Sequence, residues 1–176
     1  KPIKTPNDLK SMKIFTWAGD FKWERLWEKA GYNPVPLASV DILSGLQTGL
    51  INSFSTIPLY ALSQQSFGIA KHMLDLKWGV LMAGIVIDNR VWSRISKKYH
   101  DDLIKITKSI QNKQKNLNAN AEKESIKAMQ DYGLKVHLID ENGLKIWKDE
   151  VKKMEPELRG NIIPAKIYDK VIELTQ

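Results

Sequence analysis

Apolar and polar residues alternate along this chain with two different periods, and these periods predict strands and helices in turn. Residues 12–17, MKIFTW, form a short β-type run. After Asp20, apolar residues recur every three or four positions until Gly31, which is the spacing of one face of an amphipathic helix. Asp20 is a suitable N-cap and Gly31 a suitable terminator for that helix.

The same reading extends to the rest of the chain. Pro34 and Pro36 disfavour helix in the residues before them, so the segment around them is extended, and Pro58 suits the first position of a helix. We predict extended segments or strands at 12–17, 33–39, 50–56, 80–89 and 134–140, and helices at 42–49, 58–65, 91–96, 142–154 and 164–175. The β-α-β-α-β order predicts an α/β fold with a mainly parallel sheet and helices on its faces.

One further predicted helix is longer than a domain of this size requires. From Tyr99 to Tyr132 the chain has no Pro and no Gly, and its apolar residues fit one helical face. A helix of about 34 residues is roughly 50 Å long, so we expect it to span more than one lobe. Only the segment NLNAN at 116–120, with its low helix propensity, favours a break.

A net charge of +7 suggests an anionic partner, but the distribution of the charge does not support one. Between Arg90 and Asp131 ten Lys or Arg residues stand against five acidic residues. Most of these basic residues fall on the predicted long helix, opposite its apolar face, as on any solvated helix. No aromatic residues interleave with the lysines of that helix and no nucleic-acid-binding motif is present, so we expect no nucleic-acid partner.

The chain carries little that suggests catalysis or metal binding. His72, His100 and His137 lie 28 and 37 residues apart, without a second ligand at helix spacing. There is no glycine-rich phosphate loop and no G-x-S-x-G turn. The absence of cysteine excludes thiol chemistry and Cys-ligated metals. We therefore expect no enzymatic activity, no metal and no cofactor.

Four stretches of the sequence resemble one known family. They are DLKSMKIFTWAG at 8–19, AGYNPVPLASVDILSGLQTGLINSFSTIPL at 30–59, IDNRVWSRI at 87–95 and YGLKVHLID at 132–140, with the long helix between the last two. Together they are similar to the second half of the solute-binding proteins of TRAP transporters, the DctP-like family. The pattern G-x-x-P-x-P-L-x-S-x-D-I-x-x-G-L-Q-T-G at 31–49 is the most specific part of the resemblance.

The resemblance implies a periplasmic-binding-protein-like (type II) α/β lobe with a parallel-cored sheet and one long lobe-spanning helix. It implies a periplasmic or otherwise extracytoplasmic receptor, made with a signal peptide, that closes two lobes around a small organic solute and delivers it to a small and a large membrane subunit. On this mapping 1–81 and 135–176 belong to the second lobe, while 82–134 contribute a first-lobe strand and the spanning helix.

The same mapping implies that most of the first lobe is absent from this sequence. The predicted strand at 83–88 then lacks its native neighbours and has an exposed edge. Exposed strand edges and apolar patches promote association. We therefore expect the fragment to self-associate.

The resemblance also places a binding cleft, and this sequence departs from the family there. Most members read K-I-R where this chain reads KIF, so Phe15 replaces the arginine that pairs with the solute's carboxylate. The asparagine usual before the proline is absent, because Thr56 and Ile57 precede Pro58. The remaining candidate ligand-binding residues are Phe15, Trp17, Phe54, Ser55, Thr56 and Trp78. This largely aromatic wall suits an apolar or flat solute, including an aromatic carboxylate.

Alternative interpretations remain at this point. Phe15 alternates with Ile14 on the predicted strand, so one of the two should face the core, and Trp17 is equally suited to clamping a turn. Arg90 or Arg94 would replace the lost arginine only if the fold brought them near the strand end, and the missing lobe is another source of charge. The chain could instead be a non-transport α/β enzyme or ligand-binding domain, or an interaction module that uses the basic helix.

Overall fold

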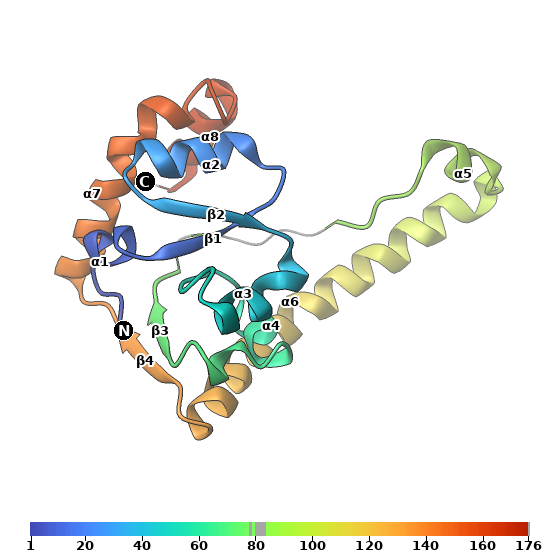
Figure 1. Cartoon of the computed structure of the whole chain (residues 1–176). Helices are drawn as coiled ribbons and strands as arrows, with labels where there is room; N and C mark the ends of the chain where they lie inside the picture. Colours follow the sequence, from blue (N-terminus) through green and yellow to red (C-terminus); the bar gives the residue numbers. More distant parts are fainter. Residues whose placement is uncertain (78, 80–83, 176) are drawn as a thin grey trace.

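The fold combines short parallel strands, helices on both of their faces and one long projecting helix (Figure 1). The computed structural model describes residues 1–77, 79 and 84–175. The helices are α1 (Pro6–Lys10), α2 (Phe21–Lys29), α3 (Ile42–Thr48), α4 (Pro58–Ser63), α5 (Asn89–Arg94), α6 (His100–Asp131), α7 (Glu141–Leu158) and α8 (Ala165–Thr175). The strands are β1 (Lys13–Trp17), β2 (Asn33–Leu37), β3 (His72–Asp75) and β4 (Lys135–Leu138). The α/β class with parallel strands is thus confirmed.

The strands form two parallel pairs. β1 pairs with β2, with Phe15 opposite Val35 and Trp17 opposite Leu37, and β3 pairs with β4. On its other side β1 receives Ser53 through a bridge at Ile14, and the Phe15 N–H donates to the Ser53 carbonyl at 2.8 Å. The strand expected at 50–56 is therefore reduced to this one bridge, because the chain turns away after Ser53 toward α4.

Two hydrophobic clusters lie on opposite faces of β1, as expected for residues that alternate along a strand. On one face Ile14 belongs to a cluster with residues from α1 and α7, including Trp147. On the other face Phe15 packs with Ile42, Leu46 and the fully buried Ile51. Because both faces of β1 are covered, the expectation that only one of Ile14 and Phe15 faces the core is wrong.

Backbone signals end the short helices where the sequence predicts. Gly49 ends α3 in the left-handed region at φ +70°, where a side chain would be strained. Pro58 is the first residue of α4. Asp20 stands at the N-cap position of α2, where its carbonyl accepts from the Glu24 N–H but its side chain makes no capping hydrogen bond. The helix α1 and the strand β3 were not predicted, and α1 is fixed by a capping box between Thr5 and Asp8.

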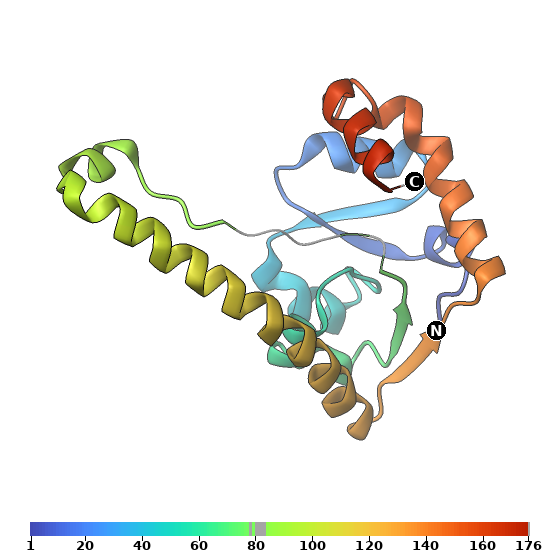
Figure 2. The same cartoon turned by 180° about the vertical axis from the view of Figure 1, so that it is seen from behind.

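The long helix is confirmed as one uninterrupted element. α6 runs for 32 residues with no break at 116–120. Its carboxyl end packs against α4 and buries Ser125 and Met129. Its amino end leaves the lobe together with α5 and the segment before it, as Figures 1 and 2 show. We call this projection the arm (residues 84–117).

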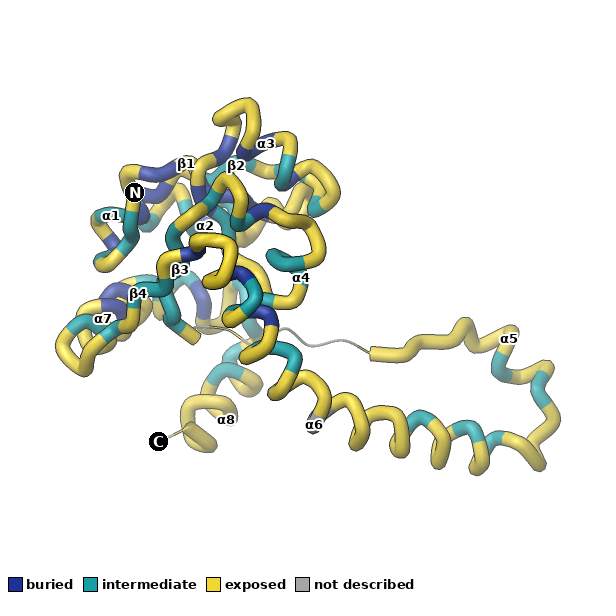
Figure 3. Tube along the Cα trace, turned by 90° about the horizontal axis from the view of Figure 1, so that it is seen from below, coloured by how far each residue is buried: buried dark blue, intermediate teal, exposed yellow. Residues whose placement is uncertain are grey.

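The arm is mostly exposed to solvent (Figure 3). Its exposed large hydrophobic residues are Ile85, Val86, Ile87, Val91, Tyr99, Ile104, Ile106, Ile110 and Leu117. The strand predicted at 80–89 is not found in its described part, because 84–88 have no neighbouring strand among the described residues to pair with. Residues 80–83 lie outside the described part of the chain.

Candidate functional site

The carboxyl ends of β1 and β2 meet on one side of the fold. Because the two strands are parallel, the segments that follow them leave the sheet on the same side, and the segment after Ser53 joins them there. In open α/β sheets this is the side where ligands bind. We call these residues the strand-end edge (17–20, 38–41 and 54–57). It collects most of the residues that the sequence predicts as ligand-binding.

Phe15 lies beneath the strand-end edge rather than on it. Its side chain is 5% exposed and belongs to the cluster with Ile42, Leu46 and Ile51. Its ring meets the ring of Trp17 edge-on, with 5.4 Å between the centroids. Phe15 therefore supports Trp17 from below, and its contact with a solute stays a prediction.

Trp17 is the exposed aromatic residue of this edge. Its side chain is 57% exposed, because it stands at the end of β1 where the covering helices no longer reach. Phe54 is half-buried and packs against the cluster that contains Phe15. Ser55 and Thr56 follow it and are exposed. The structure thus brings five of the six candidates together, and the sixth, Trp78, lies outside the described residues.

One polar group near the edge was missed from the sequence. The Thr16 side chain is 7% exposed, and its hydroxyl has no hydrogen-bond partner among the described residues. Thr16 shares the strand face of Ile14, opposite Phe15 and Trp17. Strand alternation identifies that face, but no sequence signal shows that the hydroxyl is left unpaired.

The strand-end edge carries acidic residues and no basic ones. Asp20 and Asp41 are exposed, and neither forms an ion pair within the described part of the chain. Arg90 and Arg94 lie on α5, at the far end of the arm from β1 (Figure 1). Within this structure, therefore, neither arginine is placed to replace a carboxylate clamp at Phe15.

The groups with perturbed pKa values lie away from this edge, and His72 and Tyr32 are two of them. Partial burial, and then the positive charge of the chain's amino terminus, lower the pKa of His72 on β3, whose ring nitrogen lies 2.9 Å from a ring nitrogen of His137 on β4. Burial and the charge of Glu150 raise the pKa of Tyr32 to about 12. Both groups stabilise packing between elements, and neither is joined by a nucleophile or a metal-ligand cluster among the described residues.

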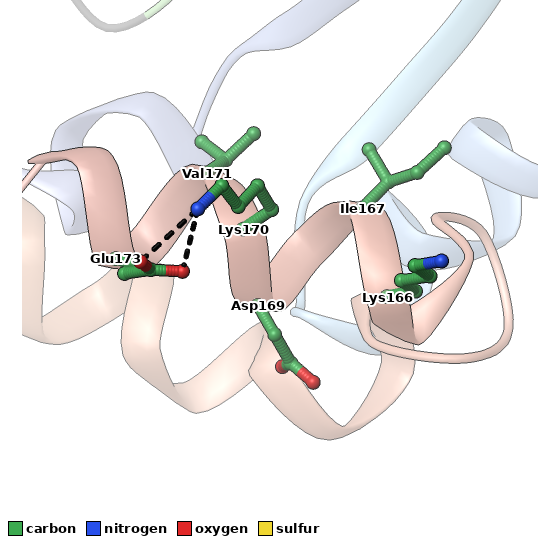
Figure 4. Close-up of a pocket in the computed structure, with 6 residues that line it drawn as sticks. All are labelled: Lys166, Ile167, Asp169, Lys170, Val171 and Glu173. Carbon is green, nitrogen blue, oxygen red and sulfur yellow. Dashed lines mark hydrogen bonds and ion pairs between the residues drawn. The ribbon is translucent and has the colours of Figure 1, made fainter.

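A shallow hollow lies on α8 (Figure 4). Its volume is about 540 Å³, and its lining comes from a single helix, on which Lys170 pairs with Glu173. The lining residues are Lys166, Ile167, Asp169, Lys170, Val171 and Glu173. Because one helix supplies the whole lining, this hollow has no converging polar groups and is not a binding site by its geometry.

None of the described helices is both long enough and apolar enough to cross a bilayer.

Parallel strands with an open carboxyl edge and helices on both faces are the architecture shared with periplasmic-binding-protein folds. The chain belongs to the DctP family, described as bacterial extracellular solute-binding protein, family 7, whose sequence profile matches residues 1–159. Membership confirms the resemblance found in the sequence. It also places the chain outside the cytoplasm, in a family of receptors rather than enzymes.

Solved TRAP solute-binding proteins share this fold. The protein of Actinobacillus succinogenes 130Z, with bound L-galactonate, is 20% identical, with a TM-score of 0.83 over 98% of this chain and 56% of its own. The protein of Shewanella oneidensis, with bound succinate, is 18% identical, with a TM-score of 0.83 over 93% of this chain and 53% of its own. The ectoine-binding protein of the TeaABC TRAP transporter of Halomonas elongata is 16% identical, with a TM-score of 0.78 over 92% and 53%.

The chain spans about half the length of these solved proteins. The remaining half of each neighbour has no counterpart among the residues of this chain. The similarity therefore establishes the fold of this chain alone.

Proposed function

We propose that this chain forms the second lobe of a TRAP-type solute receptor. In this proposal the receptor binds a small organic solute between two lobes and delivers it to a small and a large membrane subunit. The observation that carries the proposal is the match to the family over residues 1–159. In addition, the regions of similarity to solved TRAP receptors include nearly all of this chain but only about half of each receptor.

The arm supports a two-lobed assembly. The arm exposes apolar side chains such as those of Ile106, Ile110 and Leu117 to solvent. Their exposure is unfavourable for an isolated lobe, because each apolar side chain in water costs free energy. A first lobe seated on the arm would remove these side chains from water. In that assembly 1–81 and 135–176 belong to the second lobe, and 82–134 contribute a first-lobe strand and the spanning helix.

The strand-end edge is the proposed solute-binding wall of this lobe. Trp17 supplies an exposed flat apolar surface, Ser55 and Thr56 supply hydroxyl groups, and Phe15 and Phe54 hold the wall from below. Trp78 is retained as a candidate from the sequence. The neighbours' solutes are galactonate, succinate and ectoine, all small organic molecules, and a solute of this size fits between two such lobes.

Association of the isolated chain is part of the same proposal. Without a first lobe, the apolar side chains of the arm, including those of the extended segment 84–88, are available to a second copy. Burial of apolar surface contributes about 25 cal/mol per Å². The arm therefore favours self-association of the isolated chain, and a first lobe would compete for the same surface.

The function is tested on the receptor that contains both lobes. Thermal-shift screening of small organic solutes, followed by calorimetry, should find a solute that binds with a stoichiometry of one. Trp17→Ala should weaken that binding at least tenfold, whereas Tyr132→Ala, an exposed aromatic residue on the α6–β4 connection, should leave it unchanged. A receptor that binds no solute in such a screen, or equal effects of the two variants, would contradict the proposal.

A further inference from the structure

The chemistry of the strand-end edge indicates the charge of the solute. Resting on the function proposed above, we infer that the solute carries no negative charge and lies with a flat or apolar face against Trp17. The carboxylates galactonate and succinate, which two of the structural neighbours bind, fall outside this class. The inference depends on charge placement, on one helix end and on the exposed indole.

The charge of this edge is opposite in sign to the net charge of the whole chain. The chain has 27 basic and 20 acidic residues, yet segments 17–20, 38–41 and 54–57 contain two aspartates and no lysine or arginine. The nearest basic residues along the chain are Lys22, on α2, and Lys13, at the amino end of β1 and thus at the opposite end of that strand. The edge itself therefore offers no charged fork for a carboxylate, which is how proteins usually bind that group.

A helix amino end at this edge is already occupied by a carboxylate. The amino end of α2 would attract an anion through its unpaired N–H groups and dipole. Asp20 stands at the N-cap of α2, and Asp41 is the last residue of the short 3-10 turn Ser39–Asp41 that leads into α3. Both side chains are exposed and accept no capping hydrogen bond, so their negative charges face solvent at this edge. An anionic solute would meet repulsion where it would otherwise find its best backbone donors.

Trp17 offers an exposed aromatic surface for an apolar face. Its indole is 57% exposed while the buried Phe15 ring contacts it edge-on at 5.4 Å. Phe15 packs in turn with Ile42 and Ile51, so one edge of the indole is supported by the buried cluster. Aromatic faces bind flat apolar groups by area and attract cations through the ring quadrupole. Both properties suit an uncharged or cationic solute and neither suits an anion.

The experiment compares solutes of one shape and different charge on the two-lobed receptor. Matched series such as benzoate, benzamide and benzylammonium, or indole-3-acetate, indole-3-acetamide and tryptamine, are screened by thermal shift together with succinate and galactonate. Hits are measured by calorimetry. We expect the uncharged or cationic member of a series to bind at least tenfold more tightly than its carboxylate.

Charge variants then test the cause. Asp20→Asn combined with Asp41→Asn should raise the affinity for the carboxylate member severalfold, whereas Asp131→Asn, at the carboxyl end of α6, should change nothing. Lys22→Gln should leave the preference unaltered. Tightest binding of a carboxylate, or an unchanged preference in the Asp20/Asp41 double variant, would overturn the inference while leaving the receptor function intact. A screen with no hit of any charge would instead contradict the receptor function.

Discussion

Two aromatic residues on the same face of one strand, Phe15 and Trp17, are expected to differ in how much stability each loses on truncation to alanine. Phe15→Ala removes a side chain that is 5% exposed and packed within a cluster of Ile42, Leu46 and Ile51. A phenylalanine of that burial costs about 3–5 kcal/mol when truncated, because the cavity closes only in part. Trp17→Ala removes a side chain that is 57% exposed.

The expected cost of Trp17→Ala is much smaller. It loses the edge contact with Phe15, which is worth about 0.5–1.5 kcal/mol, and a minor share of buried apolar area. We expect a total near 1 kcal/mol. Its main effect should be on solute affinity in the two-lobed receptor.

Urea denaturation followed by far-UV circular dichroism measures the difference. With an m-value of about 2 kcal/mol/M, Phe15→Ala should lower the urea midpoint by about 2 M and Trp17→Ala by about 0.5 M. All variants are compared at one low protein concentration, so that association of the arm does not enter. Equal shifts, or a larger shift for Trp17→Ala, would refute the assignment of Phe15 to the core and Trp17 to the exposed edge.

Three further predictions concern the lobe and its arm. Burial alone would raise the pKa of Glu150, but ion pairs with Lys10 and Lys153 lower it. The stability that ionised Glu150 contributes should therefore persist above about pH 4.3 and be lost as the pH falls. Glu150→Gln should lower the free energy of unfolding by about 2 kcal/mol at pH 7 and reduce the loss of stability at acid pH, as measured by urea denaturation at several pH values. Gly45→Val should destabilise by about 2 kcal/mol, since even a Cβ would lie 3.1 Å from Ile51, whereas Gly68→Val meets open space; equal midpoints would contradict this. Sedimentation should show the isolated chain associating and Ile106→Lys weakening that association; a wild-type chain that remains monomeric at high concentration would count against the proposed role of the arm.

Local signals predicted much of the fold. The long helix follows from an uninterrupted stretch without Pro or Gly, and α6 confirms it. Gly49 and Pro58 set helix ends through fixed backbone preferences that need no tertiary context. The strand β1 follows from its run of β-type residues. Each of these features depends on a few neighbouring residues, which is why the sequence contains them.

Features that depend on distant residues were harder to predict. Ile14 and Phe15 are both buried because helices cover both faces of β1, and a strand buried on both faces shows no alternation. The strand at 50–56 shrinks to a bridge because only Ser53 reaches β1. The segment 84–88 has strand-like residues but no described partner to pair with. Pairing of this kind is a property of the assembled fold.

The candidate site was predicted in part. The sequence identified Trp17, Ser55 and Thr56 as neighbours at strand ends, and the structure places them on one edge. The sequence indicated Asp20 and Asp41 as caps of separate helices, but their place on the same edge of the sheet follows from the parallel pairing of β1 with β2. The charge of the edge therefore became visible only in three dimensions.

A crystal structure of the two-lobed receptor with its solute bound tests the central claim most directly. The account predicts that the solute lies between the lobes at the carboxyl ends of β1 and β2, with its flat face on Trp17 and polar atoms near Ser55 or Thr56, and that the arm is covered by the first lobe. A solute bound away from these strand ends, or an arm that remains in solvent in the closed receptor, would contradict it.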